Sequence, residues 1–485
     1  MSLNKRLLGS GPLGPVERDE YRTTLESLFG RRRFGLRPGL DVVRVLLDAL
    51  GNPQRSYPAI HITGSKGKGS VATIAQSILS AHGLRTGLFT SPHLASYRER
   101  IRIDGVPIST RGVVEGVARI DALAEKLERT GRIERPPTFF EVTTALALDR
   151  FAREEVGVAV VEVGIGGRLD ATNVLSSRVG VITTLELEHT EVLGPTLAAI
   201  ATEKAGILHP GMTGVIGRLP AEAEAIVAAE AARCGVPLWR LGTEVRVGER
   251  TLSEEGQTFT VRLPGRSFED VRMPLLGRFQ PENAALAVAA VVRFLAADGR
   301  APHEGAVRAG LGTVRWPGRL ERVGRRPEVF YDVAHTPESA RAVAESLGEI
   351  APLAEPAESS IVFGCLRGKD VDRILDALAP LARTLVVVPV RSERALGVAE
   401  VRASAIGRFP RVVLARSAEE GVRLARVATG PDGLVLVVGS DYLIGELVRR
   451  GDDRAEPDLS DPGAGERPPL PAASDAGRGP RRGGR

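Results

Sequence analysis

The chain has 485 residues, 43% of them hydrophobic and 26% charged, which suits about two or three globular domains with ordinary cores. Its net charge is +5, and its two cysteines, Cys234 and Cys365, are too few for a disulfide framework or a four-thiolate zinc site. No signal-peptide pattern and no run of about 18 apolar residues occurs, so we expect a cytoplasmic protein with no membrane partner and two buried, free thiols.

Six lysines stand against 59 arginines. Arg is permanently charged and forked, whereas Lys is a compact amine that can lose its proton, so a site that needs a point charge or a reactive amine cannot use Arg. Each remaining lysine therefore invites a functional question. The arginines are scattered and aromatic residues amount to 4%, so we expect no nucleic-acid partner. The lysines are Lys5, Lys66, Lys68, Lys126, Lys204 and Lys369.

Helices and strands are predicted to alternate from the start of the chain. Residues 18–50 suggest two helical segments separated by glycines and Pro38. The run Val156–Val163 is apolar and β-rich without interruption, as expected of a strand buried on both faces. Further strands are predicted over residues 59–63, 86–90 and 179–185, and helices over residues 69–82, 111–130, 139–155, 283–297 and 302–310. Short alternating pieces over residues 243–273 predict antiparallel hairpins instead.

A second alternation follows Trp316-Pro317-Gly318. Strands are predicted over residues 329–333, 360–365, 385–388, 412–414 and 434–438, with helices over 337–348, 370–381 and 418–428 between them. The predicted fold class is therefore α/β. A P-loop-type, mostly parallel sheet domain over residues 1–314 is followed by a smaller Rossmann-like α/β domain over residues 315–450. Residues 451–485, rich in Pro, Gly, Ala and charge, predict a disordered tail.

A glycine-rich loop between the first strand and its helix is a candidate phosphate site. Glycines let backbone amides approach phosphate oxygens, and the helix N-terminus favours an anion. Lys68 would place a point charge on the β- and γ-phosphates, and Ser70 would offer its hydroxyl to the nucleotide or to Mg²⁺. The spacing differs from the standard P-loop, and the alternative is a glycine turn that only joins strand to helix. The candidate residues are Gly64, Ser65, Lys66, Gly67, Lys68, Gly69 and Ser70.

Three further residues are candidate metal ligands. Glu162 ends a buried parallel strand, where an acid points into the ligand crevice, and the less favoured alternative is a salt-bridged acid at the strand end. His189 follows another strand and is either a ligand or a loop histidine. Lys204 is either a structural lysine with a snorkelling stem or, if its pKa is depressed, an amine that reacts with CO₂ to give a carbamate ligand. The nearby Gly164–Gly167 only mimics a dinucleotide fingerprint, because Leu169 takes the third glycine position.

Several motifs occur together and in order along the chain. They read HITGSKGKGS, LFTSPHL, RERIRIDG, PTFFEVTTAL, VVEVGIGGRLDATNV, LEHTEVLG, EKAGI, FQPENAALA, WPGRLE and DVAHTPES. On these motifs, which span roughly residues 20–448, the chain resembles the folylpolyglutamate synthase/dihydrofolate synthase family of the Mur ligase superfamily. The resemblance implies an ATP-dependent amide ligase that activates a carboxylate as an acyl phosphate and joins it to the amine of L-glutamate. The acceptor would be dihydropteroate, or a tetrahydrofolate or its polyglutamates.

The resemblance also assigns roles to residues. Lys68, as a catalytic residue, and the loop glycines would hold the triphosphate. Asn283, Arg319 and Asp332 would contact the nucleotide, and His335 would face the γ-phosphate as a second catalytic residue. Ser91, Glu162 and His189 match Mg²⁺ ligands, and Lys204 matches a carbamylated lysine that serves a second Mg²⁺ and the chemistry. His93, Arg98, Arg100 and Glu141 match substrate-side positions, each with a structural role as its alternative, and Ser440 is placed near the glutamate site. A monomer is the expectation from the family, and a need for K⁺ stays open.

Four positions depart from the family pattern. Ser65-Lys66 stands where Thr-Asn is common, Glu188 where Asp is usual, Thr336 where Asn is usual, and Val333 in place of Gly. The sequence leaves open whether one or both ligase activities are present. The rival hypotheses are a Mur-type ligase acting on another carboxylate acceptor, such as a UDP-sugar peptide, and a nucleotide-binding protein with no ligase chemistry.

Overall fold

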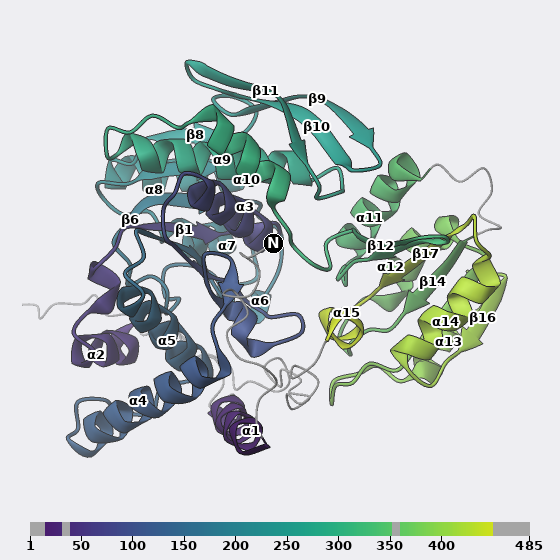
Figure 1. Ribbon diagram of the computed structural model, residues 1–485, viewed down its shortest axis with the longest axis horizontal. Coiled ribbons are helices and arrows are strands. Elements are labelled where there is room, and N and C mark those ends of the chain that lie inside the picture. Colours follow the sequence, from purple (N-terminus) through teal and green to yellow (C-terminus); the bar gives the residue numbers. More distant parts are fainter. Residues whose placement is uncertain (1–14, 32–38, 352–358, 450–485) are drawn as a thin grey trace, which may run out of the picture.

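The computed structural model describes residues 15–31, 39–351 and 359–449, so the predicted tail at 451–485 lies outside the described residues. Figure 1 shows two α/β lobes side by side. The larger lobe runs from helix α1 (Pro15–Gly30) to helix α10 (Glu304–Thr313), and the smaller lobe runs from strand β12 (Glu321–Arg325) to helix α15 (Asp441–Val448). The boundary predicted between residues 314 and 315 falls in the connection between α10 and β12.

An eight-stranded sheet organises the larger lobe. Its order is β4-β3-β2-β5-β1-β6-β7-β8. The six strands from β2 to β8 in this order are parallel, and β3 and β4 are added antiparallel at one edge. The strands are β1 (Ala59–Thr63), β2 (Thr86–Phe89), β3 (Ile101–Ile103), β4 (Val106–Pro107), β5 (Val158–Glu162), β6 (Ser177–Ile182), β7 (Thr213–Ile216) and β8 (Leu238–Arg240).

Both faces of this sheet are buried by helices, which explains why its central strands are almost wholly apolar. In β5, Val158 and Val160 pack with helices α3, α9 and α10, whereas Ala159 and Val161 pack with helices α1, α2, α4 and α5. A separate cluster joins helices α7 and α8 to the sheet. The further bounds are α2 (Asp41–Ala49), α3 (Lys68–Ala81), α4 (Thr110–Arg129), α5 (Phe139–Arg153), α6 (Thr190–Leu193), α7 (Leu197–Ala205), α8 (Ala221–Cys234) and α9 (Gln280–Ala296).

A three-stranded antiparallel sheet, β11-β10-β9, is attached to the larger lobe (Figure 1). Its strands are β9 (Arg246–Ser253), β10 (Gly256–Leu263) and β11 (Arg266–Met273). Phe259, Val261 and Phe268 face the core that contains α9, so the sheet extends the hydrophobic cluster on that side. These strands confirm the hairpins predicted over residues 243–273.

The smaller lobe is built on a six-stranded sheet of order β12-β13-β17-β14-β15-β16. All of its neighbours are parallel except the β12–β13 pair. Helices α11, α12 and α13 cover one face, and α14 and α15 cover the other. The remaining bounds are β13 (Glu328–Tyr331), β14 (Ser359–Phe363), β15 (Thr384–Val387), β16 (Arg411–Leu414), β17 (Leu434–Val438), α11 (Pro337–Ile350), α12 (Val371–Leu378), α13 (Val398–Ala405) and α14 (Ala418–Thr429).

The predicted fold class is confirmed. The prediction that both cysteines are buried needs a correction. Both cysteines are free, but only Cys365 is buried, because Cys234 lies in the last turn of α8, where one side of the helix faces solvent. Within the described ranges, no helix is long and apolar enough to cross a membrane.

Candidate functional site

The candidate site is a cavity of about 900 Å³ at the carboxyl ends of the parallel strands, lined by residues of both lobes. Open α/β sheets place their ligands at this edge, where the loops that follow the strands converge. The loop between β1 and α3 forms one wall of the cavity. Arg319, Asp332 and His335 of the smaller lobe line it from the opposite side.

The loop between β1 and α3 is pinned to the end of β6. The backbone N–H of Ser65 donates to the Thr184 carbonyl at 2.7 Å, and the N–H of Lys66 donates to Thr184 Oγ1 at 2.9 Å. The Thr183 hydroxyl in turn donates to the Lys66 carbonyl at 2.5 Å. Because Thr183 and Thr184 directly follow β6, these contacts attach the loop to the neighbouring strand of the sheet.

Gly67 directly precedes α3 and has φ of +85°, a conformation that side chains rarely adopt. A Cβ atom at this position would also lie 2.5 Å from Oδ1 of Asn283. Asn283 lies in the second turn of α9, where it donates to Gln280 Oε1 at 3.1 Å. The structure therefore brings the predicted nucleotide residue Asn283 directly against the glycine loop.

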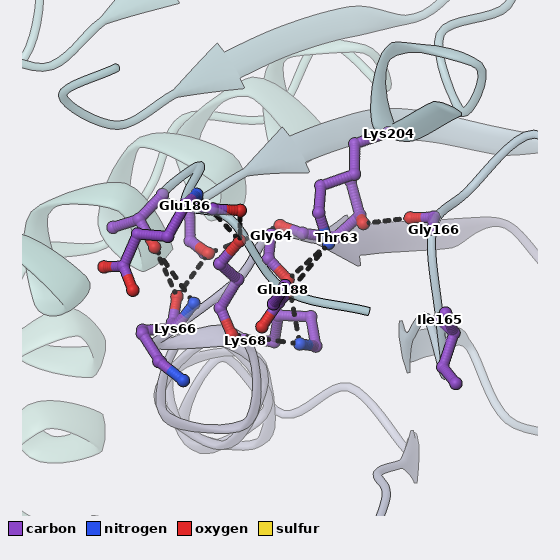
Figure 2. Close-up of polar contacts among 12 residues, drawn as sticks. Thr63, Gly64, Lys66, Lys68, Ile165, Gly166, Glu186, Glu188 and Lys204 are labelled. Carbon is purple, nitrogen blue, oxygen red and sulfur yellow. Dashed lines mark hydrogen bonds and ion pairs between the residues drawn. The ribbon is translucent and has the colours of Figure 1, made fainter. Parts of the chain in front are cut away.

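Two lysine ammonium groups converge on one backbone carbonyl of the loop (Figure 2). Lys68 Nζ donates to the Gly64 oxygen at 2.8 Å, and Lys204 Nζ donates to the same oxygen at 2.9 Å. Lys204 also ion-pairs with Glu188 at 3.1 Å, and its side chain is only 2% exposed. It therefore lies behind the loop, among fixed polar partners.

Burial and charge shift the pKa values of this pair. Burial, followed by the charge of Lys68, lowers the pKa of Lys204 to about 8, although Glu188 opposes the shift. Burial alone would raise the pKa of Glu188, but Lys68, Lys204 and Lys66 outweigh it and lower that pKa to about 2. Glu188, one of the departures from the family pattern, is thus held ionised among three lysines.

Glu162 ends β5 and is buried at the floor of the cavity. Its Oε2 accepts the N–H of Ser91 at 3.0 Å. Burial raises the pKa of the Glu162 carboxyl, against the opposing effects of Lys68 and this hydrogen bond. His189 lines the same cavity from the residue that precedes α6. No cluster of three or more His, Cys, Asp or Glu side chains with metal-binding geometry occurs in residues 15–31, 39–351 and 359–449.

The smaller lobe contributes a second buried carboxylate. Asp332 follows β13, and its two oxygens accept the N–H groups of Leu320 and Ala334, each at 2.7 Å. Burial raises the pKa of Asp332 to about 6, although Arg319 lowers it. His335 Nδ1 lies 2.9 Å from the Val333 carbonyl, which can only accept, so Nδ1 carries the proton. Burial and then Lys369 lower the pKa of His335 to about 4, which keeps its ring neutral.

Some of the substrate-side candidates line the cavity, whereas others make contacts within the protein. Arg100 lines the cavity, donates to His93 Nδ1 at 2.9 Å and lies 5.2 Å from the Phe139 ring. Arg98 donates to the Ser96 hydroxyl at 3.3 Å. Glu141 also lines the cavity, but its carboxylate caps α5 through Thr138 and ion-pairs with Arg135 at 2.8 Å, as in its structural alternative.

The structure brings most of the predicted residues to one cavity, with five exceptions. Ser440 accepts the N–H of Tyr442 at the start of α15. Lys204 lies behind the loop, where its ammonium group donates to the carbonyl of Gly64. The predicted residues that line the cavity are Ser65, Lys66, Gly67, Lys68, Gly69, Ser70, Ser91, Arg100, Glu141, Glu162, His189, Asn283, Arg319, Asp332 and His335. Those that do not line it are Gly64, His93, Arg98, Lys204 and Ser440.

Trp316 is a residue of this region that the sequence analysis did not single out. A Cβ atom on Gly69 would lie 2.7 Å from Trp316 Cζ2. Two guanidinium groups lie over the indole, with Arg102 at 5.5 Å and Arg319 at 6.0 Å from its ring centre. Its place in WPGRLE, directly between the two predicted domains, was the only signal for this contact.

Comparison with known proteins agrees with this geometry. Residues 62–291 match the Mur ligase middle domain, and residues 318–441 match the Mur ligase glutamate ligase domain. The dihydrofolate synthase/folylpolyglutamate synthase of Mycobacterium tuberculosis is 41% identical over 387 residues, which cover 77% of this chain and 78% of the relative. The chain belongs to the folylpolyglutamate synthase/dihydrofolate synthase family. It is thus an ATP-dependent ligase.

A further relative and a solved structure are also similar over most of this chain. The folylpolyglutamate synthase of Lacticaseibacillus casei is 36% identical over 402 residues, covering 83% of this chain and 91% of the relative. The structure of Mycobacterium tuberculosis folylpolyglutamate synthase in complex with ADP superposes with a TM-score of 0.80 at 37% identity. That match covers 89% of this chain and 98% of the other.

The contact between Gly69 and Trp316 yields a prediction. We expect Gly69→Ala to weaken ATP binding about tenfold, because the added Cβ forces the start of α3 or the indole to move. Isothermal titration with ATP measures the effect. Replacing Trp316 by Leu in the same chain should restore part of the affinity.

Gly312→Ala in α10 is the matched control, because a Cβ there meets no atom within 4 Å. Unchanged ATP affinity in Gly69→Ala, or a loss of the same size in Gly312→Ala, would contradict the steric explanation.

Proposed function

We propose that this protein uses ATP to join L-glutamate to dihydropteroate, to reduced folates, or to both. The observation that carries the proposal is the single cavity that unites the lysine-bearing phosphate loop with buried carboxylates from both lobes. A ligase needs this arrangement because the nucleotide and the activated carboxylate must meet in a place from which water is excluded. The names of the family members supply the folate acceptors.

The phosphate loop is assigned to the triphosphate. Its backbone N–H groups and the N-terminus of α3 favour an anion, and Lys66 and Lys68 line the cavity beside them. In the described structure Lys68 donates to the carbonyls of Gly64 and Ser65. A phosphate oxygen would therefore replace these carbonyls as its acceptor, or share the ammonium group with them.

The residues at the cavity floor fit a Mg²⁺ ion. Glu162 is a buried carboxylate whose described hydrogen bond is the one from the Ser91 amide, and burial disfavours its charged form. A divalent cation would compensate for that burial, and oxygen ligands suit Mg²⁺. We assign Glu162, Ser91 and His189 to one Mg²⁺ and the carbamate of Lys204 to a second. When bound, Mg²⁺ neutralises charge on the transferring phosphate.

The reaction we propose has two steps. A carboxylate oxygen of the acceptor attacks the γ-phosphorus, the bond to the bridging oxygen breaks, and ADP leaves. The neutral amine of L-glutamate then attacks the acyl carbon, inorganic phosphate leaves, and the nitrogen gives up a proton. His335 is suited to orient an N–H or O–H group of a substrate, because its neutral ring keeps a lone pair on Nε2.

Several finer expectations remain predictions. They are the two Mg²⁺ sites, the carbamate, the monomeric state, the cytoplasmic location and the lack of a nucleic-acid partner. A need for K⁺ and the choice between one and two ligase activities stay open.

Arg100, at the cavity wall beside Phe139, is the cation we assign to an anionic or pterin group of the acceptor.

A product assay tests the proposed function. With ATP, Mg²⁺ and L-glutamate, we expect dihydropteroate or tetrahydrofolate to gain glutamate, with one ADP formed for each amide bond. Mass spectrometry of the pterin products measures both acceptors in parallel. Slow ATP hydrolysis without a glutamylated product from either acceptor would favour a nucleotide-binding protein without ligase chemistry. A product with a UDP-sugar peptide alone would favour the Mur-type alternative.

A second prediction concerns Lys204. With its pKa lowered to about 8, Lys204 has a much larger neutral fraction near neutral pH than an ordinary lysine, whose pKa is about 10.4. Carbamate formation should therefore increase as the pH rises through about 8. Native mass spectrometry in bicarbonate should show one bound CO₂, and Lys204→Ala should lose both this mass and the ligase activity.

Lys126→Ala is the control, because Lys126 is an exposed lysine on α4. It should keep the bound CO₂ and full activity. Full ligase activity in Lys204→Ala would refute the assigned role.

A further inference from the structure

We propose that Leu276 and Arg278, in the segment between β11 and α9, are positioning residues that hold α11 of the smaller lobe at the nucleotide cavity. The segment runs from Leu275 to Phe279 and is called the anchor segment below. It belongs to the larger lobe in sequence, but its side chains divide between the two lobes. The proposal deepens the ligase function and rests on it for its kinetic readout.

Leu276 joins the two hydrophobic cores. Its neighbour Leu275 is buried in the cluster formed by the central sheet, α3 and α9. Leu276 is 5% exposed and belongs instead to the cluster of the smaller lobe, together with Val343 and Leu347 of α11. Two successive residues are thus buried in different lobes, so a rotation of one lobe against the other must disturb at least one of them.

Arg278 adds a polar contact to the same helix. Its backbone N–H donates to the Ser346 hydroxyl at 3.1 Å, and that hydroxyl donates to the Ala342 carbonyl at 2.7 Å. The guanidinium group of Arg278 lies 3.0 Å from Glu345 Oε2 and 2.9 Å from Glu349 Oε1. One arginine therefore bridges two acids one turn apart on α11, with a different nitrogen of its planar guanidinium group on each acid.

The three-stranded sheet supports the anchor segment from behind. Arg250 of β9 also ion-pairs with Glu349. Gln257 of β10 is 2% exposed and donates to the carbonyls of Leu275 at 2.5 Å and Gly277 at 3.2 Å. Because Gln257 fixes the backbone on both sides of Leu276, the segment is held on a rigid support.

The position of α11 matters because the helix serves two purposes along its length. Glu338, Ser339, Ala342 and Val343, in its first two turns, line the nucleotide cavity. Ser346, Leu347 and Glu349, in its last turns, contact the larger lobe through the anchor segment and Arg250. Figure 1 shows α11 on the side of the smaller lobe that faces the larger one. Fixing its far end therefore fixes the cavity wall.

The energetic consequence is a shift of population between arrangements of the lobes. If the anchor is weakened, a smaller fraction of molecules holds the smaller lobe correctly before ATP binds. The apparent dissociation constant rises by the inverse of that fraction, whereas saturating ATP, which contacts both lobes, restores the arrangement. A loss of folded protein has the opposite signature, because it lowers the apparent kcat and leaves KM unchanged.

The experiment measures KM for ATP and kcat of the full chain. We expect Leu276→Ala to raise KM for ATP about tenfold and Arg278→Ala, whose ion pairs are partly exposed, to raise it about threefold, with kcat of both variants within about threefold of the original. Leu276→Met, which conserves volume, should keep the original KM, whereas Arg278→Lys should keep it only in part, because Lys lacks the planar fork through which Arg278 contacts each acid with a different nitrogen. Small-angle X-ray scattering without nucleotide should show a larger radius of gyration in the two Ala variants, and ATP should reverse it.

Two matched controls separate positioning from stability. Leu375→Ala removes a fully buried leucine from α12 in the same core, and it should lower the melting temperature without changing KM. Arg233→Ala breaks an exposed ion pair with Glu230 and should change neither.

Each outcome bears on one proposal. An unchanged KM in Leu276→Ala and Arg278→Ala, with or without a fall in kcat, would overturn the positioning role. If the unaltered protein makes no glutamylated product, the ligase function fails instead. The positioning role is then decided by the ATP dissociation constant and by scattering, which need no turnover.

Discussion

The carbonyl oxygen of Gly64 accepts two ammonium groups, from Lys68 at 2.8 Å and from Lys204 at 2.9 Å. A single dipole cannot balance two cations, and Glu188 adds one negative charge beside Lys204. Several other features depend on this arrangement. The loop must present its carbonyl inward, which the hydrogen bonds to Thr183 and Thr184 enforce, and α7 must end against the loop so that Lys204 can reach it. Burial of the second ammonium group is what lowers the pKa of Lys204.

Much of the fold could be predicted because the central strands are buried on both faces and carry an uninterrupted apolar signal. Residues 59–63 and 434–438 form strands with the predicted limits, and the hairpins at 243–273 follow from alternation at the surface of one core. Elements with weaker patterns were missed. Helix α8 is rich in alanine and glutamate with few large apolar residues, and β12 is a mostly polar edge strand, so neither stands out from a loop.

The residues of the candidate site also fall into those that the sequence predicted and those that it did not. Glu162 was predictable because it ends a buried strand and the sheet gathers those ends at one edge, whereas Asp332 was predicted only from the family motif. Contacts between distant segments were not predictable. Nothing local in the sequence places Lys204 against Gly64, Trp316 against Gly69 or Leu276 in the core of the smaller lobe, because each depends on how separately folded units pack. Glu141 shows the reverse case, where a helix cap and an ion pair already occupy a residue that a motif marks as a substrate contact.

The scarcity of lysine has a practical consequence for experiments on this molecule. Among the lysines of the described part of the chain, only Lys126 is exposed, Lys66, Lys68 and Lys369 are partly covered, and Lys204 is buried. A reagent that acylates amines would therefore modify few positions, and two of the partly covered ones line the nucleotide cavity. Slower acylation of Lys66 and Lys68 relative to Lys126 would therefore report that the cavity is occupied. No label would have to be introduced into the chain for this measurement.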